Sequence, residues 1–103
     1  MKWDELQKGH YYVGHNGSSI ILFHFNGNIE DASGHNHPVK RIECYSLMHV
    51  GVRVKSYVRD AIIIVSLDEE FKEIAEDDYL KLMKLRKMFE SVVFPLIKQL
   101  VKN

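Results

Sequence analysis

Histidine is the residue type whose abundance in this chain suggests chemistry. There are six histidines among 103 residues, and His35 and His37 lie close together in a polar segment that begins with Glu30 and Asp31. Imidazole and carboxylate groups bind borderline metals such as zinc. An H-x-H pair supplies only two ligands, however, and no C-x-x-C or H-E-x-x-H motif accompanies it. We therefore expect a solvated loop with no metal or other cofactor, and His35 and His37 are the candidate ligands should a metal bind.

Cys44 is the one cysteine, and a thiol beside an imidazole could act as a nucleophile with its base. Its alternation with Ile42 along a strand-like segment instead indicates a small buried apolar residue. The sequence contains no G-x-S-x-G motif, phosphate-binding loop or dinucleotide-binding fingerprint. We therefore expect no catalytic residues and a protein that is not an enzyme, with a histidine-based metal protein or small hydrolase kept as an alternative.

A basic stretch between residues 40 and 59 raises the possibility of nucleic-acid binding. It contains five basic residues against one acidic residue, with two tyrosines interleaved, a composition that single-strand binders use for phosphate contacts and base stacking. Basic residues on the outer face of strands are also ordinary. The candidate nucleic-acid contacts are Lys40, Arg41, Arg53, Lys55 and Arg59.

The segment from Val92 to Ile97 is apolar around its whole circumference, which is unusual for a surface helix. It either folds back on its own sheet or packs against a second copy of the chain across a two-fold axis. We favour the second arrangement, so the leading prediction is a small interaction or accessory module that forms homodimers or binds another protein. The predicted interface residues are Val93, Phe94, Leu96, Ile97 and Leu100.

Length and composition limit the class of protein. A chain of 103 residues holds one core and hence one domain, residues 1–103. Fourteen basic residues balance fourteen acidic ones, so no long-range field attracts nucleic acid or an anionic membrane. With one cysteine and no apolar run near the ~20 residues that span a bilayer, we expect a cytoplasmic protein without membrane contact.

The elements that must position these residues change character near residue 68. From Tyr11 to Leu67, β-branched and aromatic residues alternate with Gly and Asn, which is typical of strands and turns. Asn16-Gly17 and Asn26-Gly27 predict two hairpin turns that bracket a strand. That strand places Ile21, Phe23 and Phe25 on one face. The unbroken apolar run Ala61–Val65 predicts a strand buried on both faces at the centre of its sheet.

The last third of the chain predicts a helix. Acidic residues come early and basic residues late, as the helix macrodipole favours, and Leu82, Leu85, Phe89, Val92 and Leu96 form an apolar stripe. Ser66-Leu67-Asp68-Glu69 resembles a capping box, which would begin the helix there. We favour a later start near Glu76, after a short extended segment at Phe71–Ile74, and expect a kink or break at Pro95. The expected fold is α+β: an antiparallel, meander-like sheet of about five strands with the C-terminal helix packed on one face.

Overall fold

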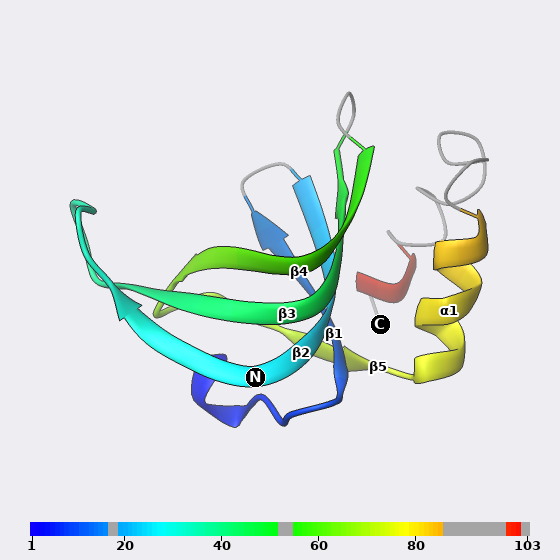
Figure 1. Ribbon diagram of the computed structural model, residues 1–103, viewed down its shortest axis with the longest axis horizontal. Coiled ribbons are helices and arrows are strands. Elements are labelled where there is room, and N and C mark those ends of the chain that lie inside the picture. Colours follow the sequence, from blue (N-terminus) through cyan, green and yellow to red (C-terminus); the bar gives the residue numbers. More distant parts are fainter. Residues whose placement is uncertain (17–18, 52–54, 86–98, 102–103) are drawn as a thin grey trace.

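The computed structural model describes residues 1–16, 19–51, 55–85 and 99–101 (Figure 1). A single 3-10 turn at Trp3–Glu5 (η1) precedes strands β1 (Tyr11–Asn16), β2 (Ser19–Ala32), β3 (Val39–Val50), β4 (Lys55–Ser66) and β5 (Lys72–Ile74), and helix α1 (Glu76–Leu85) follows. The strands form one antiparallel sheet in the order β4-β3-β2-β1-β5. The predicted α+β class, strand number and meander are confirmed. Pro95, where a kink was predicted, lies outside the described residues.

The first predicted hairpin is confirmed, because β1 pairs with β2 up to the partners Asn16 and Ser19. The second predicted turn is wrong. Asn26 and Gly27 lie inside the continuous strand β2, and Phe25 pairs with Cys44 while Ile29 pairs with Ile42. Residues 26–28 therefore form a bulge opposite a single residue of β3. Gly27 has φ +99°, so the glycine supplies the left-handed conformation that a bulge needs rather than a reversal of the chain.

The predicted central strand Ala61–Val65 lies instead in β4, at one edge of the sheet. Its burial alternates: Ala61, Ile63 and Val65 are buried, whereas Ile62 and Ile64 are exposed. An unbroken apolar run predicts burial on both faces, but the outward residues of this edge strand have no covering layer among the described residues. The prediction is wrong because apolar residue type does not report how many neighbours a strand has.

The predicted late start of the helix is confirmed. Phe71 is a buried loop residue, β5 follows as a three-residue strand paired with β1, and α1 begins at Glu76. Three acidic residues occupy the first turn of α1, where they interact favourably with the helix dipole. Leu82 of the predicted stripe is buried. Phe89, Val92 and Leu96 lie outside the described residues.

Two clusters of buried side chains cover opposite faces of β2. Ile20 and Leu22 belong to the cluster under α1, which also contains Met48, Tyr79 and Leu82. Ile21, Phe23 and Phe25 belong to the other cluster, together with Cys44, Ile63 and Phe71. The alternation predicted for β2 is therefore confirmed. The long strands β2, β3 and β4 are strongly curved (Figure 1). Trp3 and Leu6 pack against the second cluster from the N-terminal segment.

The C-terminal residues 99–101 are helical and lie beside the face that α1 covers (Figure 1). Leu100 and Val101 pack against the cluster under α1, and the Lys72 ammonium donates a hydrogen bond to the Leu100 carbonyl at 3.1 Å. No helix in the described part of the chain is long and apolar enough to cross a membrane.

Candidate functional site

Three of the six histidines line one surface pocket of about 260 Å³. His15 lies near the end of β1, whereas His35 and His37 lie in the loop between β2 and β3. Glu69, from the turn after β4, lines the same pocket. The other lining residues are Val39, Ile64, Val65 and Ser66. The fold therefore gathers imidazole and carboxylate groups from three separate segments around an aliphatic surface.

A hydrogen bond fixes the position of Glu69 in this histidine pocket. The backbone N–H of His15 donates to Glu69 Oε1 at 3.0 Å, and the Glu69 backbone N–H donates to the Ser66 carbonyl at 3.2 Å. The first bond joins residues 54 positions apart. The carboxylate is thus attached to the end of β1, beside one of the imidazoles.

The sequence singled out His35 and His37 but missed His15 and Glu69, which complete the pocket. Within residues 1–16, 19–51, 55–85 and 99–101, no three His, Cys, Asp or Glu side chains are grouped closely enough to hold a metal ion as they stand. His15, His35 and His37 are all exposed. The pocket therefore contains residue types that bind metals, but not in an arrangement that could hold an ion.

The other three histidines have different surroundings. His10 Nδ1 lies 3.1 Å from Glu73 Oε2 at the surface. The His24 ring stacks on Tyr11 with centroids 4.1 Å apart, and burial lowers the pKa of its imidazole. The Nε2 atom of His49 is buried without a hydrogen-bond partner among the described residues. None of the three lines the histidine pocket.

Cys44 is placed as a core residue, as its position in the sequence predicted. Its side chain is buried in the cluster that contains Ile21, Phe23 and Phe25, and burial raises the pKa of the thiol to about 12. The Cys44 thiol donates only a long contact of 4.0 Å to the Ile42 carbonyl. A thiol with this pKa stays protonated at neutral pH and is a poor nucleophile.

The basic stretch is partly engaged by acidic residues of the sheet. Lys40 pairs with Asp31 and lies 4.1 Å from the centre of the Trp3 ring. Arg41 Nη1 lies 2.9 Å from Glu43 Oε1 and 3.6 Å from Glu30 Oε2. Arg59 is exposed on β4; Arg53 and the Lys55 side chain lie outside the described residues. Lys40 and Arg41 are therefore paired with carboxylates of the same chain. Nucleic-acid binding stays a prediction.

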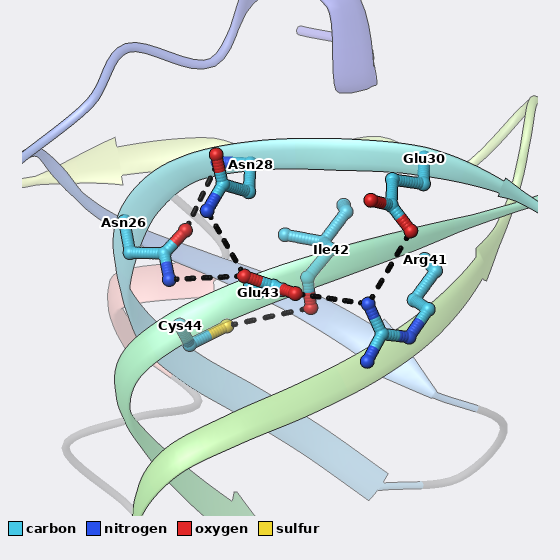
Figure 2. A network of polar contacts seen from close by, with 7 residues as sticks. All are labelled: Asn26, Asn28, Glu30, Arg41, Ile42, Glu43 and Cys44. Carbon is cyan, nitrogen blue, oxygen red and sulfur yellow. Dashed lines mark hydrogen bonds and ion pairs between the residues drawn. The ribbon is translucent and has the colours of Figure 1, made fainter.

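Figure 2 shows how Glu43 holds the bulge of β2 to β3. The side-chain amides of Asn28 and Asn26 donate to Glu43 Oε2 at 3.0 and 3.4 Å, and Arg41 donates to Oε1 at 2.9 Å. The Asn28 backbone N–H donates to Asn26 Oδ1 at 2.9 Å. These donors hold the pKa of Glu43 below its usual value, the Asn28 bond contributing most. The network is a structural clamp on the bulge.

Exposed apolar side chains occur repeatedly along β4. Ile62 and Ile64 have exposed fractions of 47% and 39%, and we call these two residues the β4 row. Val58 is 46% exposed, but it lies opposite Leu47, which packs against the cluster on the other face. Ile62 lies opposite Glu43 and Ile64 opposite Arg41, so both project from the face that carries the polar network. Tyr45 on β3 adds an exposed aromatic ring, at 43%.

The interface predicted from the sequence is described only at its end. Leu100 contacts the chain's own core cluster, whereas Val93, Phe94, Leu96 and Ile97 lie outside the described residues. Self-association through this C-terminal segment stays a prediction.

Comparison of the chain with protein families, with characterised proteins and with solved structures found no match.

Proposed function

We propose that this protein is a non-enzymatic interaction module whose partner is a second copy of itself, bound through β4. The observation that carries the proposal is the β4 row, the exposed Ile62 and Ile64, on a strand at the edge of the sheet. Proteins usually protect an edge strand with charges, bulges or a covering segment. Here the six residues from Ala61 to Ser66 carry no charge and no proline.

The backbone of β4 supports the same surface. β4 is twelve residues long and pairs with β3, so half of its backbone N–H and C=O groups point away from the sheet. Among the described residues, no other strand pairs with this outer edge. Two-fold antiparallel pairing with β4 of a second copy would satisfy these groups and bring the two β4 rows together.

A second copy fits this surface better than a strongly charged partner. The exposed side chains of the row are aliphatic, and the chain has no net charge, so two copies do not repel each other at long range. Arg59 and Asp60 adjoin each other on the strand, which allows complementary contacts between copies. Asp60 has φ +52° and lies between Arg59, which pairs with Ser46, and Ala61, which pairs with Cys44, so β4 is irregular at this position.

Sedimentation velocity over a range of micromolar concentrations tests the proposal. We expect the wild type to approach twice the 12.1 kDa of one chain, and Ile62→Lys to sediment as a folded monomer, because an edge lysine opposes strand pairing. Leu80→Lys is the matched control, since Leu80 is an exposed apolar residue of α1. A monomeric wild type, or a dimer that Ile62→Lys leaves intact, would refute the proposal.

The C-terminal segment is tested in the same experiment. Phe94→Asp and Ile97→Asp place a charge in the interface predicted from the sequence. If these variants dissociate a dimer that survives Ile62→Lys, the copies associate through the C-terminal segment and not through β4. Folding of every variant is checked by circular dichroism.

A further inference from the structure

We propose that the histidine pocket makes self-association depend on pH, because protonation of His15, His35 and His37 separates two copies that are paired through β4. This regulation rests on the proposed function, since it acts on the same surface. One residue connects the two features of the fold: Ile64 belongs to the β4 row and also lines the histidine pocket. The next two residues of β4 line the pocket as well.

The charge of the pocket changes near neutral pH. Histidine is the side chain that ordinarily gains or loses its charge between about pH 5 and pH 8, and the three pocket histidines are exposed. Among the described residues, Glu69 is the one carboxylate that lines the pocket. Protonation of all three imidazoles therefore turns a single negative charge into an excess of two positive charges.

Other charged groups lie next to the pocket along the chain, on β3 and between β4 and β5. Lys40 on β3 pairs with Asp31. Glu70, in the segment after β4, pairs with Lys2 and with the N-terminal amine. Asp68 in the same segment is exposed, so solvent and salt screen its charge. Histidine is thus the residue type at this place whose charge ordinarily changes near neutral pH.

Pairing through β4 would bring the pockets of two copies close together. The uncharged segment Ala61–Ser66 is about 20 Å long at the rise of about 3.4 Å per residue in antiparallel strands. Its last three residues line the pocket, so pairing of two such segments about a two-fold axis leaves the pockets within about 20 Å of each other along the strands. At about 0.01 M salt the Debye length is about 30 Å, and positively charged pockets therefore repel each other across this distance.

Sedimentation velocity of the full chain in low salt, at about pH 8 and about pH 5, tests the regulation. We expect dimers at the higher pH and mainly monomers at the lower pH. The dissociation constant should rise about tenfold or more, since facing like charges weaken an interface at least that much. Salt at about 1 M should restore association at the lower pH, because it shortens the Debye length to about 3 Å. Circular dichroism checks that the chain is folded under each condition.

Histidine variants show which groups cause the effect. The combined variant His15→Gln, His35→Gln and His37→Gln removes the three imidazoles and should stay dimeric at the lower pH. His10→Gln is the matched control, because His10 is a partly exposed histidine that pairs with Glu73 outside the pocket. This control should dissociate at the lower pH as the wild type does.

The outcomes separate the regulation from the self-association on which it rests. A wild type that stays dimeric at the lower pH overturns the regulation and leaves pairing through β4 intact. Dissociation of the combined variant to the same extent as the wild type also overturns it, because groups outside the pocket then cause the effect. A wild type that is monomeric at the higher pH refutes the self-association and the regulation together.

Discussion

The hydroxyl oxygens of Tyr79 and Ser46 lie 2.7 Å apart in the buried layer between α1 and β3. Ser46 is the buried polar side chain of β3, and Tyr79 is buried in the first turns of α1. Burial raises the pKa of the Tyr79 hydroxyl to about 12, so the pair is neutral across the physiological range. This bond fixes how the helix sits on the sheet, because the rest of that layer is formed largely by apolar contacts, which are not directional.

Tyr79→Phe should therefore lower the free energy of unfolding by about 1–3 kcal/mol, since it leaves the buried Ser46 hydroxyl without its partner. Urea unfolding followed by circular dichroism measures the change. Tyr45→Phe removes the same atom from an exposed tyrosine of β3 and should change stability by less than about 0.5 kcal/mol. Equal effects of the two variants would show that the Tyr79–Ser46 bond contributes nothing specific.

Cys44 should not react with iodoacetamide in the folded protein. The thiol is buried and its pKa is raised to about 12, so neither access nor the thiolate form is available at neutral pH. Mass spectrometry after alkylation checks this, with the protein unfolded in urea as the positive control. Rapid modification under native conditions would restore Cys44 as a candidate nucleophile.

Gly14→Ala should destabilise the fold strongly. A Cβ atom at this position would lie 2.8 Å from Cδ1 and 3.0 Å from Cε1 of Phe71, and both groups are buried. Overpacking of this kind costs about 1–3 kcal/mol. Thermal unfolding measures the loss. Combining Gly14→Ala with Phe71→Leu should cost less than the sum of the two single changes, because the smaller side chain removes the clash; strict additivity would contradict this explanation.

Glu43 should make stability depend on pH in the acid range. Hydrogen bonds from Asn28, Arg41 and Asn26 lower the pKa of Glu43 in the folded state. Because the folded pKa is lowered, ionised Glu43 stabilises the protein at pH values above the unfolded pKa of about 4.3. This stabilisation is lost as the pH falls through the folded pKa. The variant Glu43→Gln should therefore show a shallower loss of stability below about pH 4.5 than the wild type. Parallel pH profiles for the two proteins would argue against the clamp.

Local signals in the sequence were sufficient for part of the fold. Asn16-Gly17 predicted the β1–β2 hairpin because its turn chemistry is local. The alternation of Ile21, Phe23 and Phe25 predicted which face each side chain occupies, since the period of a strand is two. The short extended segment at Phe71–Ile74 predicted a helix start near Glu76, where α1 begins.

Long-range relationships could not be predicted in this way. Asn26-Gly27 suits both a hairpin turn and a bulge, because both need a residue with positive φ. The pairing of β2 with β3 on both sides of this dipeptide makes it a bulge. The apolar run Ala61–Val65 does not encode its position at the edge of the sheet. The histidine pocket depends on His15 and Glu69, 54 residues apart, which come together because β5 pairs with β1.

Amide hydrogen exchange along β4 tests the central claim, self-association through this strand, most directly. In an antiparallel sheet, alternate N–H groups of an edge strand point away from the neighbouring strand. We predict that the outward amides of β4 exchange rapidly in dilute protein and become protected as the concentration rises. Ile62→Lys should abolish that concentration dependence. Outward amides that exchange equally fast at all concentrations, in a wild type that sediments as a dimer, would contradict pairing through β4.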